Sequence, residues 1–258
     1  MCLVLIAVDR HPEYPIVVAM NRDEFYERPT KEAHYWLDQP HILAGRDLEK
    51  GGTWLGLHRA GKFALVTNFR DSGPISNASK SRGLLVRDFL SADLSPLDYL
   101  HRVRQSHSDY NGFNLIVGES LSVVYYSSQT DRIVRLGPGL YGLSNHLLDT
   151  PWPKVKRGKE RFQHWLGAGS LEPDPLLQVM KDPETFSDES LPKTGVGIEM
   201  ERLLAPIFVQ SPRYGTRSTT FFALGSKGNL HFVERSYNAA GEIADRQEYR
   251  FNPREDEA

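Results

Sequence analysis

The fold is decided at the start of the chain, where residues 1–8 read MCLVLIAV and residues 16–23 read IVVAMNRD. Continuous apolar runs of this length are typical of strands that are covered on both faces. The segment between them contains Pro12 and Pro15, which favour a turn. We therefore predict an antiparallel hairpin formed by residues 2–8 and 16–23.

Cys2 is the only cysteine among the 258 residues. If Met1 is removed, Cys2 carries both a thiol and a free α-amine, so that a nucleophile and its general base belong to one residue. Both groups then titrate close to neutral pH. The alternative is a buried apolar cysteine that happens to begin a strand.

The hairpin indicates which residues face Cys2. Antiparallel pairing around the proline turn places Cys2 opposite Asn21, Arg22 or Asp23. Asn21 and Asp23 share one face of the strand while Arg22 and Glu24 share the other, and a slip of one residue would exchange the pair that meets Cys2. Asp23 is the preferred partner, because a carboxylate can orient a terminal amine by a charge-assisted hydrogen bond.

The rest of the chain alternates between strand-like and helix-like segments. Strands are expected at 52–58, 62–68, 113–117, 122–127, 132–136, 140–144, 218–224, 230–235 and 243–251. Helices are expected to begin at Ser81 and Ser95 and to cover 152–166, 175–180 and 198–208. This order predicts an α+β fold of two antiparallel sheets with helices outside, in a single domain spanning residues 1–258.

Composition excludes several classes of partner. The 31 Lys and Arg against 33 Asp and Glu give a net charge of −2 without a basic block, which argues against nucleic acid. No apolar stretch is long enough to span a membrane. A single cysteine suits a reducing compartment, so we expect a cytoplasmic protein, and no metal-binding pattern occurs.

A set of short motifs together resembles the NRDE family, also called the transport and Golgi organisation protein two family. The motifs are Met1-Cys2, NRDEF at 21–25 with RP at 28–29, GGTWLG at 51–56, VTNFR at 66–70, GLSN at 142–145, PWPK at 151–154 and GTRST at 215–219. The resemblance covers nearly the whole chain. It implies an N-terminal-nucleophile hydrolase fold, a four-layer αββα sandwich similar to that of penicillin V acylases and bile-salt hydrolases.

The resemblance also implies roles for individual residues. Cys2 would be the nucleophile, Asp23 would hold its amine, Asn68 and Asn145 would donate to the oxyanion, and Arg217 would be the distal arginine near the thiol. The residues expected to contact substrate are Asn21, Arg22, Glu24, Arg28 and Trp54.

One position departs from the acylase pattern. That pattern carries an arginine three residues before its Asp, where this chain has Met20. Arg22 and Arg28 are candidate substitutes, although neither is expected at the same strand phase. The sequence thus favours a cysteine amidohydrolase or thioesterase for a small acyl substrate, without a catalytic cofactor. The alternative is a non-catalytic carrier that uses the same site for haem, as cargo, or for acyl-coenzyme A.

Overall fold

The computed structural model describes residues 2–70, 80–169 and 171–251. Within them the chain divides into two compact units. The first contains residues 2–27, Arg70 and the described residues from 138 onward, and the second contains residues 28–69 and 80–137. Each unit is built on one antiparallel sheet, which confirms the predicted α+β class with two antiparallel sheets.

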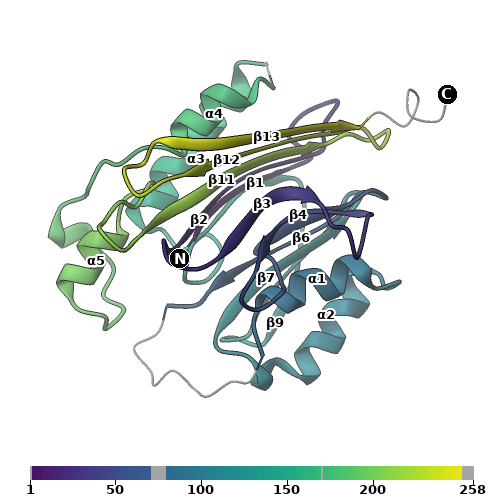
Figure 1. Ribbon diagram of the computed structural model, residues 1–258, viewed down its shortest axis with the longest axis horizontal. Helices are drawn as coiled ribbons and strands as arrows, with labels where there is room; N and C mark the ends of the chain where they lie inside the picture. The colour runs from purple at the N-terminus through teal and green to yellow at the C-terminus, as the bar shows by residue number, and fades with distance from the viewer. Residues whose placement is uncertain (1, 71–79, 170, 252–258) are drawn as a thin grey trace. The chain divides into compact units, whose positions relative to one another are not determined.

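The first unit has a six-stranded sheet in the order β10-β1-β2-β11-β12-β13. Its strands are β1 (Cys2–Val8), β2 (Ile16–Phe25), β10 (Gly139–Leu143), β11 (Tyr214–Leu224), β12 (Leu230–Tyr237) and β13 (Ile243–Phe251). Helices α3 (Pro153–Gly167) and α4 (Pro173–Val179) lie along this sheet, and α5 (Ile198–Leu204) follows them in the chain (Figure 1).

Alternation along β1 and β2 decides which side chains α3 and α4 cover. Leu3 and Leu5 of β1 and Ala19 of β2 pack with Phe162 of α3 in one buried core. Because these three strand residues share a face, the helices cover that face, which also carries Asn21 and Asp23. All seven residues of β1 are buried, as its continuous apolar run predicts.

The second unit has a seven-stranded sheet in which the strands follow chain order, β3 to β9. They are β3 (Thr30–Tyr35), β4 (Ile42–Asp47), β5 (Leu55–His58), β6 (Lys62–Asn68), β7 (Phe113–Glu119), β8 (Ser122–Ser127) and β9 (Arg132–Leu136). Helices α1 (Gly83–Ser91) and α2 (Pro96–Gln105) pack on one face of it (Figure 1). Ser95 caps α2, since its hydroxyl accepts from the backbone N–H of Asp98 at 3.2 Å.

The structure differs from the sequence-based expectation in two strands and at several boundaries. Strands β3 and β4 were not predicted. The strand expected from Gly52 begins at Leu55. The last helix ends at Leu204 rather than at 208, because Pro206 has no N–H with which to donate a helical hydrogen bond.

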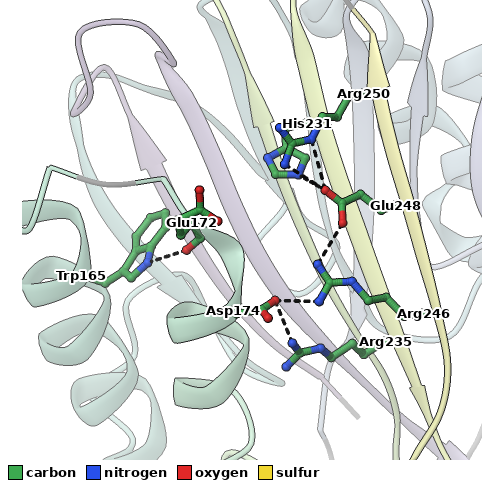
Figure 2. Close-up of polar contacts among 8 residues, drawn as sticks. All are labelled: Trp165, Glu172, Asp174, His231, Arg235, Arg246, Glu248 and Arg250. Carbon is green, nitrogen blue, oxygen red and sulfur yellow. Dashed lines mark hydrogen bonds and ion pairs between the residues drawn. The ribbon is translucent and has the colours of Figure 1, made fainter.

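Charged side chains connect α4 to the outer strands of the first sheet. Asp174 of α4 accepts from Arg235 and from Arg246, each at 2.8 Å (Figure 2). Glu248 of β13 also binds Arg246, and it accepts from Arg246, Arg250 and His231 at 2.9 to 3.0 Å. These contacts place α4 over β12 and β13.

Candidate active site around Cys2

The register of the opening hairpin settles which residues share a face with the thiol. Cys2 pairs with Arg22 across β1 and β2. Strand alternation therefore puts the Cys2 thiol, Met20 and Arg22 on one face, and Asn21 and Asp23 on the other. The expectation that Arg22 differs in strand phase from Met20 is wrong, because two residues along a strand return to the same face. The acylase pattern carries an arginine where this chain has Met20. Arg22, the next residue on the same face of β2, supplies a positive charge close to that position.

The end of β10 brings Ser144 and Asn145 to the backbone of Cys2. Pairing of Val4 with Leu143 places the next residues beside the start of β1. The Ser144 hydroxyl donates to the Cys2 carbonyl at 2.9 Å, and the Cys2 N–H donates to Asn145 Oδ1 at 3.4 Å. The structure thus brings two predicted site residues, Cys2 and Asn145, together. Their contact is made through the nitrogen that would become the free amine.

A β-bulge in β11 positions the partner of Asp23. Thr216 pairs with Asp23 and Ser218 pairs with Arg22, so Arg217 is the extra residue between them. The Thr216 hydroxyl donates to Asp23 Oδ1 at 2.7 Å. Burial raises the pKa of the Asp23 carboxyl, and the positive charge of Lys154 opposes that rise. Asp23 is therefore a buried carboxyl group whose ionised form is favoured by the charge of Lys154.

The Cys2 thiol is almost fully buried, with 7% of the residue exposed. Burial raises the pKa of this thiol, because the charged thiolate is poorly solvated. A hydrogen bond from the backbone N–H of Asp23 and the charge of Arg22 act in the opposite direction. Both groups stabilise a thiolate and so favour a nucleophile.

Three charged residues that sequence reasoning missed are buried in the same unit. Arg70 and Glu201 form an ion pair at 2.5 Å. Lys154, the second residue of α3, donates from Nζ to the Leu204 carbonyl at 2.9 Å. Burial lowers the pKa of Lys154 to about 8. We refer to Cys2, Asp23, Arg70, Asn145, Lys154 and Glu201 as the Cys2 cluster.

The cluster is connected through backbone as well as side chains. The Arg70 N–H donates to the Asn145 carbonyl at 2.7 Å, so the Arg70–Glu201 pair is joined to the residue that contacts the Cys2 nitrogen. Arg70 and Lys154 belong to the motifs VTNFR and PWPK, which was the only sequence signal for them. Glu201 carried no such signal.

Asn21 has a structural position rather than a substrate-facing one. Its Nδ2 donates to the carbonyls of Met180 and Ile207, both at 2.8 Å, and its Oδ1 accepts from Thr219 at 2.7 Å. Its side chain is fully buried on the helix-covered face. Asn21 thus fastens the loops after α4 and α5 to β2, and we do not propose it as a substrate residue.

Glu24 lies at the end of β2, and Arg217 of β11 lies beside that end. The guanidinium of Arg217 donates to the carbonyls of Phe25 and Tyr26 at 2.9 and 3.2 Å. Glu24 accepts from the N–H of Phe25 at 2.9 Å. These contacts hold the chain where it leaves β2. The roles of Arg217 near the thiol and of Glu24 at the substrate stay predictions.

Three further predicted residues belong to the second unit. Asn68 ends β6 and pairs with Phe113. Arg28 forms an ion pair with Asp47 at 2.7 Å, and Trp54 is buried. Their roles as oxyanion donor and substrate contacts stay predictions.

Comparison with known proteins identifies the family. A family model described as Transport and Golgi organisation 2 matches residues 1–239. The chain belongs to this family. A relative from Bos taurus, the Transport and Golgi organization protein 2 homolog, is 36% identical over 257 residues, covering 92% of this chain and 93% of its own.

Two solved structures are similar in fold to this family member. One is a Caenorhabditis elegans N-acylethanolamine-hydrolyzing acid amidase ortholog, with a TM-score of 0.50, 9% identity and coverage of 85% of this chain and 92% of its own. The other is the C2A mutant of a conjugated bile acid hydrolase from Clostridium perfringens, with a TM-score of 0.50, 9% identity and coverage of 98% and 97%. These likenesses show an N-terminal-nucleophile hydrolase-like fold.

Membrane-spanning helices and metal-ligand clusters are both absent from the described residues. Over residues 2–70, 80–169 and 171–251, no helix combines the length and apolar character that a membrane crossing requires. In the same part of the chain, no three His, Cys, Asp or Glu side chains gather as metal ligands.

Proposed function

We propose that Cys2, once Met1 is removed, is the N-terminal nucleophile of an amidohydrolase or thioesterase that acts on a small acyl substrate. The observation that carries this proposal is the environment of the Cys2 nitrogen and thiol. The nitrogen contacts Asn145 Oδ1, and the thiol receives the N–H of Asp23 within a buried polar cluster. A cysteine that only filled space in a core would have apolar neighbours instead.

The chemistry follows from the two groups on one residue. The Cys2 amine takes the thiol proton, and the thiolate attacks the substrate carbonyl to form a C–S bond. The C–N or C–S bond of the substrate then breaks, and the leaving group takes the proton from the ammonium. Water hydrolyses the thioester, which releases the acid and restores the thiol.

Amide donors would stabilise the oxyanion that forms during this attack. Asn145 is the proposed donor within the first unit, and loss of one such donor typically costs about 2.7 to 4 kcal/mol of transition-state stabilisation. The Oδ1 end of Asn145 already contacts the Cys2 nitrogen, so Asn145 would orient the amine as well. The names of the two proteins with this fold, an amidase and a hydrolase, support this class of reaction.

The second candidate is a non-catalytic carrier of haem or an acyl-coenzyme A. The raised pKa of the buried Cys2 thiol favours it, because a neutral thiol is a weak nucleophile. The two candidates differ in whether Cys2 forms a covalent bond with its ligand.

Turnover assays with a matched variant separate the two functions. Wild-type protein would be incubated with p-nitrophenyl esters and p-nitroanilides of acyl chains of increasing length, with Cys2→Ala as the control. Hydrolysis that is lost in Cys2→Ala supports the enzyme. Absence of turnover, together with saturable binding of haem or acyl-coenzyme A by both proteins, would replace the enzyme with the carrier.

A further inference from the structure

A cavity in the second unit lies between α1 and α2, and none of its lining residues belongs to the Cys2 cluster. The two helices lie side by side (Figure 1), and the Tyr99 hydroxyl of α2 donates to the Leu85 carbonyl of α1 at 2.7 Å. The cavity has a volume of about 340 Å³. Binding sites for small molecules span about 300 to 1,000 Å³, so this space suits a ligand with a single ring.

The lining of the cavity combines buried apolar side chains with exposed charged ones. Leu85 and Tyr99 are buried in the core of this unit, whereas Asp88 and Arg102, three residues later on the same two helices, are exposed. Residues three apart share one side of a helix, so each helix contributes both kinds of side chain to the cavity. The half-buried Tyr110 adds a second aromatic ring. Such a lining fits a ligand with an aromatic body and a charged end.

The charged groups of the lining differ in whether they already have a partner. Lys80 pairs with Asp109 at 2.7 Å, and Asp88 pairs with Arg87 at 2.6 Å. Within residues 2–70, 80–169 and 171–251, the guanidinium of Arg102 makes no hydrogen bond or ion pair. The lining therefore carries one uncompensated positive charge, which favours a ligand with a single negative charge.

An acid on the same helix does not compensate Arg102. Asp98 lies one turn earlier on α2, and its carboxylate accepts from the Ser95 hydroxyl at 2.6 Å. In the part of the chain that the structure describes, Asp98 forms no ion pair. The guanidinium of Arg102 thus keeps its donors for a ligand, and its planar shape matches a carboxylate through two parallel hydrogen bonds.

Two other groups of the lining have unused hydrogen-bonding capacity. The Tyr110 hydroxyl makes no hydrogen bond to any described residue. Both hydrogen bonds from Arg87 to Asp88 end on Oδ1, at 2.6 and 2.8 Å, so Oδ2 is open to a donor. The cavity therefore offers a cation, a hydroxyl and a carboxylate oxygen together with two aromatic rings.

We propose that this cavity is a ligand site distinct from Cys2 and that it binds a hydroxylated aromatic carboxylate. Arg102 binds the carboxylate, with the Tyr110 hydroxyl as a second donor. The hydroxyl of the ligand donates to Asp88 Oδ2, and its ring packs with the rings of Tyr99 and Tyr110. Binding at this site is non-covalent and does not depend on the proposed acyl transfer.

Isothermal titration calorimetry of the full chain with 4-hydroxyphenylacetate tests this site. The uncharged 4-hydroxyphenylacetamide is expected to bind about tenfold more weakly, because it lacks the charge that pairs with Arg102. Phenylacetate, which lacks the hydroxyl, is expected to bind about threefold to tenfold more weakly. Equal or tighter binding of the amide would overturn the assignment of a carboxylate ligand.

Arg102→Gln and Arg104→Gln form a matched pair of variants on α2. Each removes one positive charge, but Arg104 lies outside the lining and pairs with Asp131 at 2.6 Å. Arg102→Gln should weaken binding of 4-hydroxyphenylacetate about tenfold, whereas Arg104→Gln should bind it like wild type. Asp88→Ala should weaken binding of 4-hydroxyphenylacetate and leave binding of phenylacetate unchanged.

Equal affinities of Arg102→Gln and Arg104→Gln would overturn the site, as would the absence of saturable binding to the wild type. Cys2→Ala should bind 4-hydroxyphenylacetate with wild-type affinity. Loss of binding in Cys2→Ala would place the ligand at Cys2 and defeat a separate site. A protein that binds 4-hydroxyphenylacetate through Arg102 but hydrolyses no acyl substrate would retain this site and lose the proposed enzyme.

Discussion

At the scale of single residues, the Cys2 cluster is held together by charges that depend on one another. Arg70 and Glu201 are both buried and pair at 2.5 Å, and Thr194 donates from its backbone N–H to the second Glu201 oxygen at 2.9 Å. A buried charge without its partner is costly. Loss of either member of the pair should therefore lower the stability of the fold, whatever its role in chemistry.

Substitution of Glu201 tests this dependence. Glu201→Gln places an amide opposite the Arg70 guanidinium and removes the compensating charge, so the free energy of unfolding should fall by about 3 to 5 kcal/mol. The measurement is urea unfolding followed by circular dichroism. Glu199→Gln, on the exposed side of the same helix, is the control and should change stability by well under 1 kcal/mol. Equal decreases in the free energy of unfolding for Glu201→Gln and Glu199→Gln would show that the buried ion pair does not stabilise the fold more than an exposed one does.

The pKa of Lys154 makes a separate prediction about stability and pH. Burial lowers this pKa from 10.5 to about 8, so between these values the unfolded chain binds more protons than the folded protein. Wild-type stability therefore gains a contribution as pH rises through this window, and Lys154→Met lacks it. The difference in unfolding free energy, variant minus wild type, should fall by about 3 kcal/mol between pH 7 and pH 10.5. A difference that stays constant with pH would mean that Lys154 is not a buried cation.

Some residues of the site were predictable and others were not. Cys2, Asp23 and Asn145 stood in recognisable motifs. Antiparallel pairing predicted that Cys2 lies opposite Asn21, Arg22 or Asp23, and the structure has Arg22 there. Glu201 lies in an ordinary short helix, and only the folded chain shows that it pairs with a residue 131 positions away. Long-range ion pairs leave no local pattern in a sequence.

At the scale of elements, most strands were predicted, and β3 and β4 were missed. β3 reads TKEAHY and is only partly buried, so neither composition nor alternation marked it. The bulge in β11 was also invisible, although it aligns Thr216 with Asp23 and displaces Arg217 from the ladder. The apolar alternation of a strand is unaffected by one extra residue near its end.

The contacts between α4 and the outer strands predict an acid-sensitive contribution. Burial opposes ionisation of Glu248, but hydrogen bonds from Arg246, His231 and Arg250 outweigh it and lower the pKa to about 2. Because this pKa lies below the unfolded value of 4.5, the stabilisation is complete above about pH 4.5 and is lost as pH falls toward 2.

Glu248→Gln measures that contribution. Because the side chain is one-third exposed, the loss at pH 7 should be about 1 kcal/mol, and the variant should match wild type near pH 2. Thermal unfolding at several pH values would show this convergence. The exposed Glu160→Gln is the control, and a deficit that persists at pH 2 would contradict the electrostatic explanation.

At the scale of the whole molecule, family and fold were predictable together because several motifs recur along one chain. The match to the family spans residues 1–239, and each predicted sheet was found. Activity does not follow from fold, because one fold supports many chemistries. The proposed function therefore depends on the state of Cys2, which would be the nucleophile of the reaction.

The most direct measurement is the intact mass of the purified protein before and after incubation with an activated acyl ester. We predict a chain that lacks one methionine and gains a single acyl group, which neutral hydroxylamine removes and which Cys2→Ala never acquires. A chain that retains Met1 in full, or an acyl group that Cys2→Ala acquires equally, would contradict the assignment of Cys2 as an N-terminal nucleophile.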